Sequence, residues 1–253
     1  MNLFVDKQSV VRKIWGNSDT VLFIFAGAAA EFALNKAVDW LYFTGRLPAD
    51  PIGRLFSTVA YARSIVFSEI NKANNAIDKI HSIHTAVEEN RSAKIPDWAY
   101  RDVLFMLIDY SIRSYELLER KLTPAEKEEV FSTFLRVGNR MQIKGLPASY
   151  GEWLPMREQH LKEDMIHSAY TTDLYKQYRK HLGTMRFFIL RQAQILVVPA
   201  QVNKLLRHGK ISILKPVIFF YKFFRTFKMD WFLKNLVLPS EYKAQIKALD
   251  IAE

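Results

Sequence analysis

Glycine and proline are scarce in this chain, and their scarcity constrains its fold more than any other feature. The 253 residues contain 9 Gly and 9 Pro, together about 7% against roughly 12% in average proteins. Because these residues punctuate turns, a chain with few of them disfavours sandwiches and barrels and favours long helices. Period-2 alternation of apolar and polar residues is nowhere sustained. We therefore predict an all-α fold in which residues 1–253 form a single multi-helix domain.

The overall composition excludes several classes of protein. With 49% apolar and 25% charged residues, the chain has enough hydrophobic side chains to bury a core, unlike a disordered protein. It contains no cysteine, which excludes a disulfide framework, a thiolate metal site and a cysteine nucleophile. A formal charge of +10 indicates an anionic partner, either a nucleic acid or a membrane surface, and composition does not choose between them.

No segment predicts export or a membrane span. Residues 1–7 lack the basic start, apolar stretch and small-residue cleavage site of a secretory signal. The longest uncharged apolar stretch, 21–30, ends at Glu31, whereas a spanning helix needs roughly 18 to 20 such residues. We expect a cytoplasmic protein with no signal peptide and no transmembrane helix. Peripheral attachment to the inner face of a membrane stays an open option.

Capping residues and apolar patterning predict helices along most of the chain. The side chains of residues 17–19 can accept the free N–H groups of a first helical turn, and the apolar stretch 21–42 then predicts a buried central helix. Small residues at 26–30 would let another helix or a flat ligand approach its backbone closely. Residues 45–53 predict a loop.

Further helices are predicted after this loop. One helical region covers 54–91, another 98–122, and a later one much of 152–181. Between them, Thr123-Pro124-Ala125-Glu126 reads as a capping box with proline at the first helical position, which predicts a helix start. A short polar helix is predicted after Leu238-Pro239.

Sequence motifs of several common enzyme classes are absent. The Gly-x-Ser-x-Gly, Gly-x-x-x-x-Gly-Lys and Gly-x-Gly-x-x-Gly patterns do not occur, so hydrolase, nucleotide-kinase and nicotinamide-dependent functions have no local support. Two carboxylates, Glu31 and Asp109, lie in apolar contexts typical of a raised pKa. Glu31 must be paired or lie at a functional surface, and Arg54 and Arg113 are equally good partners for it.

Six histidines remain as candidates for a metal site. His81 and His84 are three residues apart and share one face of a predicted helix, which by itself is a weak metal signal. An equally good interpretation is one solvent-facing histidine and one whose ring is satisfied within the core. The other four stand in charged contexts and are expected to have no functional role: His160, His167, His181 and His208.

Several motifs follow one another in a characteristic order. An apolar stretch of small residues comes first, then Asp-Pro-x-x-Arg-Leu-x-x-Thr, then His-x-x-Val. The segments that carry them are 25–33, 50–55 with Thr58 and Tyr61, 84–87, 122–126 and 238–239. In their order and spacing these motifs resemble those of the rubber oxygenase and MpaB family, which includes the latex-clearing proteins. The resemblance covers roughly residues 20–165, with a weaker echo at the C-terminus.

This resemblance implies an all-helical protein that holds one haem b and cleaves alkenes in isoprenoid chains with dioxygen. By motif position, His84 would be the proximal iron ligand, with Arg54 and Thr58 near the haem. Arg54 could pair with a haem propionate, and Thr58 could donate a hydrogen bond to a propionate or to bound oxygen. The implied function is a haem b-dependent oxygenase for an apolar, isoprenoid or lipid-like alkene. The alternative is a non-catalytic helical protein of the same fold that binds haem or a lipid.

Such a site requires the chain to reverse its direction between Thr58 and His84. In one straight helix the 26 positions between them would span about 39 Å at 1.5 Å per residue. Residues 68–71 can interrupt and restart a helix, so we predict a helical hairpin that turns near 67–72. The residues expected to line an apolar substrate pocket are Phe23, Ala26, Ala30 and 105–107.

Residues 203–236 combine basic and aromatic side chains. They hold eight Lys or Arg and one acid, Asp230, interleaved with aromatic residues such as Phe219 and Trp231. This pattern fits an amphipathic segment at an anionic membrane surface, a packed C-terminal subdomain, or a binding site for single-stranded nucleic acid. We favour the membrane because the implied substrate is lipid-soluble. Nucleic acid is the least supported partner, since no recognition fold accompanies the segment.

Overall fold

The computed structural model describes residues 2–45 and 49–219, and the structural statements below concern those residues. Within them every bounded element is a helix, and strand-like pairing is limited to two isolated bridges. The all-α prediction is therefore confirmed for this part of the chain. Two predicted features lie outside the described residues, namely residues 220–236 of the basic aromatic segment and the helix after Leu238-Pro239.

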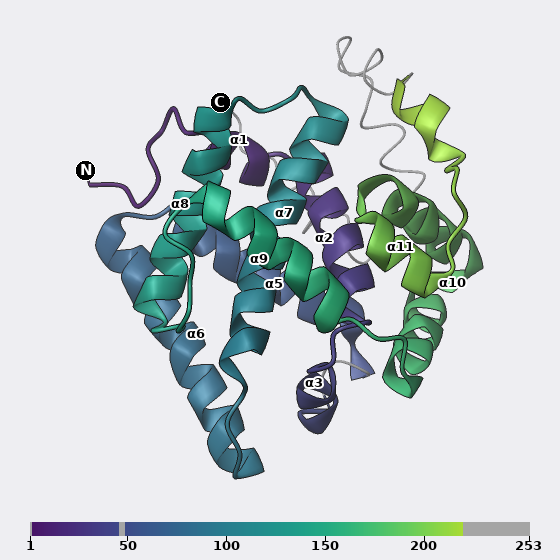
Figure 1. Cartoon of the computed structure of the whole chain (residues 1–253), viewed down its shortest axis with the longest axis horizontal. Coiled ribbons are helices and arrows are strands. Elements are labelled where there is room, and N and C mark those ends of the chain that lie inside the picture. Colours follow the sequence, from purple (N-terminus) through teal and green to yellow (C-terminus); the bar gives the residue numbers. More distant parts are fainter. Residues whose placement is uncertain (1, 46–48, 220–253) are drawn as a thin grey trace.

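The helices follow one another with short connections (Figure 1). They are α1 (Val10–Trp15), α2 (Ser18–Phe32), α3 (Asp39–Phe43), α5 (Pro51–Val66), α6 (Ile70–Arg91), α7 (Asp97–Leu118), α8 (Pro124–Arg140), α9 (Tyr150–Glu163), α10 (Ala169–Val197) and α11 (Ala200–Leu206).

Helix α2 is the predicted central helix and runs through the middle of the molecule, packed against α7 and α10 (Figure 1). Its N-cap is Asn17, whose side chain accepts hydrogen bonds from the N–H groups of Asp19 and Thr20. It ends at Phe32, ten residues before the predicted end. The reason lies in Asn35, whose side-chain oxygen accepts the Ala37 N–H at 2.7 Å and so stabilises a turn in place of further helix.

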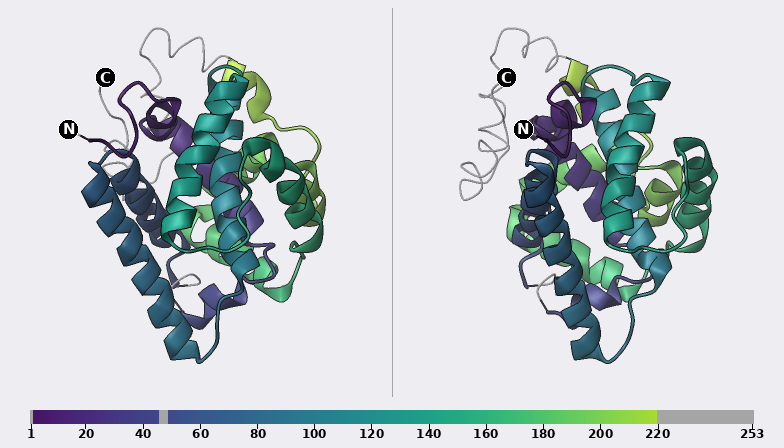
Figure 2. Two further views of the ribbon diagram at one scale, coloured as in Figure 1. Left: turned by 60° about the vertical axis from the view of Figure 1, so that its left-hand side comes forward. Right: turned by 90° about the vertical axis from the view of Figure 1, so that its left-hand side faces the viewer.

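The predicted helical hairpin is confirmed. Helix α5 ends at Val66 and α6 begins at Ile70, and the two lie side by side (Figure 2). The N-terminal segment stabilises the turn between α5 and α6. The Phe4 N–H donates to the carbonyl of Ser68, and the Ile70 N–H donates to the carbonyl of Asn2.

Two further predicted boundaries differ from those in the structure. Helix α5 begins at Pro51, because Asp50 caps it and accepts the Gly53 N–H at 2.8 Å, so the predicted loop is shorter than 45–53. The region 152–181 is divided between α9 and α10, because Ser168 caps a new helix.

The predicted capping box at Thr123 and Glu126 is present at the start of α8. None of the helices described here is long and apolar enough to cross a membrane.

The contact between α2 and α7 is close because Gly27 carries no side chain. A Cβ atom at Gly27 would lie 2.3 Å from the ring of Tyr110, a fully buried residue whose hydroxyl donates to Glu31 at 2.8 Å. The ring therefore has little freedom to move aside. We expect Gly27→Ala to lower the free energy of unfolding by about 1–3 kcal/mol, as overpacking of cores does, in urea denaturation.

Gly151→Ala is the matched control, because the nearest atom to its added Cβ would be 3.8 Å away. That substitution in α9 should be neutral or stabilising by up to about 1 kcal/mol, from helix propensity. Equal effects of the two substitutions would contradict the close approach of α2 and α7.

Candidate functional site

A cavity of about 550 Å³ lies between the C-terminal end of α2, α3, α5, the second half of α6 and the start of α7. Its volume falls within the roughly 300–1,000 Å³ typical of ligand and cofactor sites, and its walls are mostly apolar and aromatic, as such sites require. Residues that matter for its chemistry include Phe32, Trp40, Leu41, Arg54, His84 and Tyr100.

His84 reaches this cavity from α6. Burial lowers the pKa of His84 to about 4, and the positive charge of Arg54 acts in the same direction. The imidazole is therefore neutral at pH 7, which is the form that binds a metal ion. Its Nδ1 atom is buried without a hydrogen bond of normal geometry. The ring stands edge-on to the ring of Tyr100, with the two centroids 5.3 Å apart.

Glu88, one turn after His84, holds Tyr100 in this position. Its Oε1 atom accepts hydrogen bonds from the Tyr100 hydroxyl at 3.2 Å and from the Ile95 N–H at 3.0 Å, and Oε2 accepts from Lys94 at 2.9 Å. Burial would raise the pKa of Glu88, but these donors outweigh it and lower the pKa, so the side chain is a carboxylate at pH 7. Glu88 is thus held by three hydrogen bonds, one of which comes from Tyr100 in the wall beside His84.

The hairpin of α5 and α6 brings only part of the predicted site into the cavity. Arg54 lines it, with its Nη1 atom donating to Ser57 Oγ at 3.3 Å. Thr58 is not among the lining residues, and its hydroxyl donates to the carbonyl of Arg54 at 3.1 Å. His81 is exposed on the outer face of α6. The roles of His84, Arg54 and Thr58 toward a haem stay predictions.

The cavity residues fit the haem that the sequence resemblance implies. A neutral imidazole in the cavity wall suits the axial ligation of haem iron. Of the described residues that line the cavity, Arg54 is the one with a permanent charge, and a guanidinium suits a carboxylate such as a propionate. Aromatic and aliphatic walls suit the macrocycle.

The apolar pocket predicted from the sequence was placed in the wrong part of the fold. Ala26, Ala30, Phe105 and Met106 are buried in the core, and Phe23 and Leu107 pack against it. These residues belong to the contact surfaces of α2 and α7, which the close packing of the two helices fills. The cavity lies instead beyond the C-terminal end of α2, where α3 forms part of its wall.

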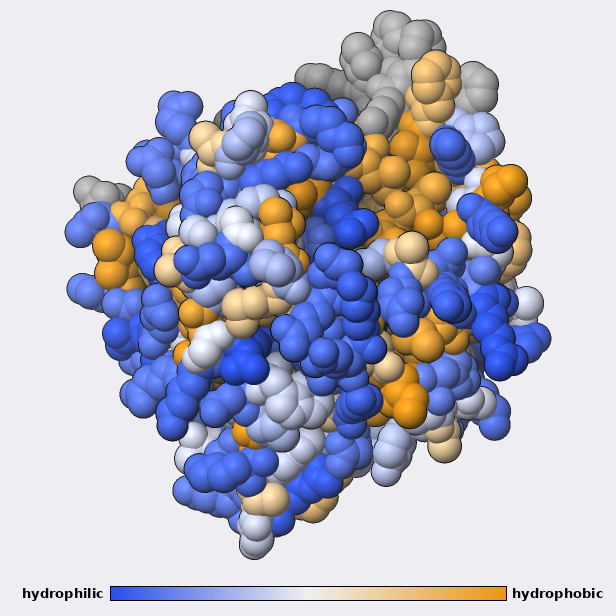
Figure 3. Space-filling view, in the orientation of Figure 1, coloured by the Kyte–Doolittle hydropathy of each residue, from blue (hydrophilic) through white to orange (hydrophobic). Residues whose placement is uncertain are grey.

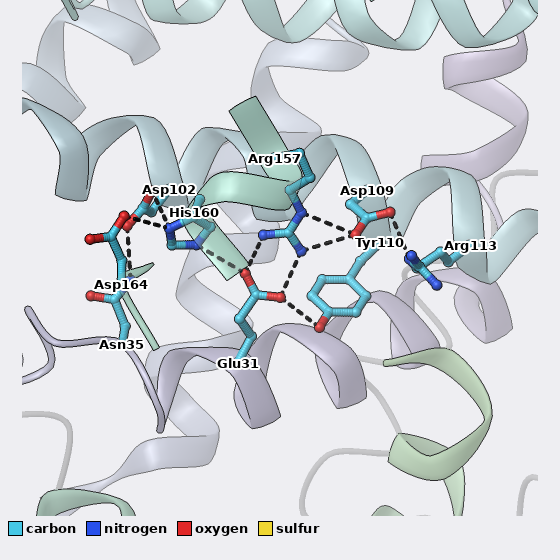
Figure 4. A network of polar contacts seen from close by, with 9 residues as sticks. All are labelled: Glu31, Asn35, Asp102, Asp109, Tyr110, Arg113, Arg157, His160 and Asp164. Atoms are coloured by element: carbon cyan, nitrogen blue, oxygen red, sulfur yellow. Dashed lines mark hydrogen bonds and ion pairs between the residues drawn. The ribbon is translucent and has the colours of Figure 1, made fainter. Parts of the chain in front are cut away.

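A second cluster of polar side chains is buried between α2, α7 and α9 (Figure 4). Arg157 donates to both oxygens of Glu31, at 2.5 and 2.7 Å, and to Asp109 at 2.9 Å. The Tyr110 hydroxyl donates to Glu31, and Arg113 donates to the other oxygen of Asp109 at 2.6 Å. Glu31 thus pairs mainly with Arg157, and neither of the partners expected from the sequence, Arg54 or Arg113, bonds it.

The ion pair reverses the pKa shift expected for Glu31. Burial alone would raise the pKa of Glu31, but the charge and hydrogen bonds of Arg157, with His160, hold it at about 2. The same contacts raise the pKa of Arg157 despite its burial. Both groups are therefore ionised at pH 7, and this side-chain pair is 5% and 1% exposed.

His160 extends this cluster toward the cavity. Its Nδ1 atom lies 2.5 Å from Asp102 and 3.2 Å from Asp164, and its Nε2 atom faces Glu31 at 3.4 Å (Figure 4). Burial alone would lower the pKa of His160, but Asp102 and Glu31 raise it to about 9. His160 is therefore an imidazolium at pH 7 with a structural role in this cluster, and the expectation that it has no functional role stays a prediction.

Asp102, His160 and Asp164 also have the residue types and proximity to hold a metal ion. In the arrangement described here, the Nδ1 atom of His160 lies within ion-pairing distance of both carboxylates. Asp102 connects the cluster to the cavity, since its Oδ2 atom accepts a hydrogen bond from Asn35 at 3.3 Å and Asn35 lines the cavity.

Sequence reasoning missed Arg157 and His160, although one signal for them exists. The two residues are three positions apart and share one face of α9, and Asp164, the residue that caps the end of this helix, follows His160 by four. A face that carries both charges and a histidine predicts a polar contact. It does not indicate that the contact is buried, because that depends on α2 and α7.

Removing Arg157 should cost far more stability than removing Arg113, although both pair with Asp109. Arg157→Met would leave Glu31 and Asp109 buried without their main cation, which costs about 3–5 kcal/mol. Arg113 is 41% exposed, so Arg113→Met should cost no more than about 1 kcal/mol. Urea unfolding measures both, and similar losses for the two variants would contradict the dominance of the buried pair.

His160 should make the protein less stable at alkaline pH. Its folded-state pKa of about 9 lies above the ordinary 6.5, so its stabilisation is complete below pH 6.5 and is lost as the pH rises through 9. We expect the free energy of unfolding to fall by roughly 1–3 kcal/mol between pH 6.5 and 9. The fall should be absent in His160→Gln, and a flat or rising wild-type profile would contradict the assignment.

Comparison with known proteins agrees with the resemblance read from the sequence. One family model matches residues 12–219, and its description is the catalytic domain of ER-bound oxygenase mpaB/B′ and rubber oxygenase. No curated protein and no solved structure matches the chain. The matched residues include almost all of the helices described above. The chain therefore belongs to the family of the mpaB/B′ and rubber oxygenase catalytic domain.

Proposed function

We propose that this protein is a haem b-dependent oxygenase that acts with dioxygen on an apolar alkene of isoprenoid or lipid-like chemistry. Its family is one of oxygenases, which supports the reaction class. The observation that carries the haem assignment is His84, a neutral imidazole in the wall of an apolar cavity.

Each residue of the cavity would have a defined task. Haem b, when bound, supplies an iron atom at which dioxygen can bind. His84 would hold that iron, and Tyr100, tied to Glu88, limits the rotation of the His84 ring. Arg54 would hold a propionate by a charge-assisted hydrogen bond.

The walls of the cavity determine which substrates it can take. Helix α3 supplies Trp40, Leu41 and Phe43 to one side, and Phe32 comes from the end of α2. These side chains offer no charged partner, so an uncharged hydrocarbon chain is favoured over a polar substrate.

Haem binding by His84 is the first test of this function. We expect the purified protein, titrated with haemin, to give a Soret absorption band, and His84→Ala to lower the haem affinity by about tenfold or more. His81→Ala is the matched control, because it removes an exposed histidine from the same helix and should leave the spectrum unchanged. A wild-type protein that takes up no haem, or equal spectra for all three proteins, would contradict the assignment.

Oxygen uptake separates an enzyme from a binding protein. The haem-loaded protein should consume dioxygen when an isoprenoid alkene is added and should form carbonyl products. A Soret band without oxygen uptake would instead support the alternative, a haem- or lipid-binding protein without turnover.

A further inference from the structure

We propose that the second half of α10 and residues 211–219 form a docking face for an anionic lipid membrane. We define the docking face by six exposed apolar side chains: Met185, Phe188, Ile211, Ile213, Val217 and Phe219. This inference goes beyond the proposed function, because it requires neither haem nor turnover.

The side chains of the docking face are unusually exposed for their type. The six are between 46% and 82% exposed, although exposed large hydrophobic residues usually occur singly on protein surfaces. Figure 3 shows hydrophobic surface gathered over the α10–α11 region and the segment that follows it. Clustered apolar exposure of this kind marks a surface that meets a partner or a membrane.

Two contacts join the separate segments into one surface. The Ser212 hydroxyl donates to the carbonyl of Gln192 at 2.9 Å, and the Ile213 N–H donates to the Gln192 side chain at 2.9 Å. Gln192 lies one turn after Phe188 on α10, so residues 211–213 are tied beside the Phe188 face. Gly183, with φ +74°, produces a kink in α10, so that the second half of the helix runs in a different direction from the first.

The segments that form the docking face carry positive charges and no negative ones. From residue 174 to residue 229 the sequence contains no Asp or Glu and twelve Lys or Arg. This acid-free stretch begins 29 residues before the basic aromatic segment singled out in the sequence and includes most of α10. Exposed basic residues near the apolar side chains include Lys204, Arg207, Lys210 and Lys215.

Apolar side chains among basic residues match the interface of an anionic bilayer. The apolar groups enter the boundary of the acyl chains, while Lys and Arg remain at the level of the phosphates. A second copy of the chain is a poorer partner, because it would bring two cationic surfaces together. Nucleic acid is also poorer, because four of the six side chains are not aromatic and offer no stacking surface.

Vesicle flotation of the full chain tests the docking face. We expect the protein to float with vesicles of phosphatidylcholine and phosphatidylserine. Its binding to vesicles of pure phosphatidylcholine should be weaker by about tenfold or more. Lys210→Gln with Lys215→Gln should weaken binding to the anionic vesicles by about tenfold. Lys72→Gln with Lys79→Gln is the control, because it removes two exposed lysines from α6, on the other side of the molecule (Figure 1).

A second pair of variants tests the apolar part of the docking face. Phe188→Ser should weaken vesicle binding by about threefold or more, whereas Leu154→Ser on α9 should leave it unchanged. The two side chains are matched, at 46% and 48% exposure. Circular dichroism confirms that each variant is folded.

Three results would overturn the proposal. They are equal binding to neutral and anionic vesicles, equal losses in the docking-face variants and their controls, and salt-sensitive retention on single-stranded DNA by a protein that binds no vesicles. Because flotation needs no haem, its outcome is independent of the Soret measurement. A failure of the docking face therefore leaves the proposed oxygenase function untouched, and the reverse also holds.

Discussion

The buried ion pair between Glu31 and Arg157 is the interaction on which the rest of the fold depends. It joins the central helix α2 to α9, and through Asp109 it also joins α7. Burying these charges is costly, and only partners held in good geometry offset that cost. The pair therefore constrains three helices to one mutual arrangement. Gly27 supports this arrangement, because its lack of a side chain lets the Tyr110 ring, bonded to Glu31, lie against α2.

The same cluster shapes the cavity at a distance. Asp102 is held by His160 and in turn accepts a hydrogen bond from Asn35. Asn35 stabilises the turn at the end of α2, and this turn leads into α3, which forms one wall of the cavity. The charged cluster thus has a structural role that reaches the candidate haem site. The chemistry of that site depends on a separate set of residues around His84.

The net charge of the protein is unevenly distributed. A formal charge of +10 for the whole chain could suggest a nucleic-acid-binding protein, but twelve basic residues and no acid stand between positions 174 and 229. In the described part of that stretch, the cations surround exposed apolar side chains rather than a groove lined with aromatic rings. The two proposals are compatible, because a hydrocarbon substrate of the proposed oxygenase would be found in the membrane to which the proposed docking face would bind.

The sequence alone determined the helical class, the caps of α2 and α8, the hairpin of α5 and α6 and the family. These features follow from local patterns and from the order of motifs, which a linear chain displays directly. Tertiary structure alone decided that Arg157 pairs with Glu31, that His160 is a buried imidazolium, and that the cavity lies beside α3 rather than between α2 and α7. Those outcomes depend on burial and on charges supplied by other helices, and neither is visible from spacing along one helix.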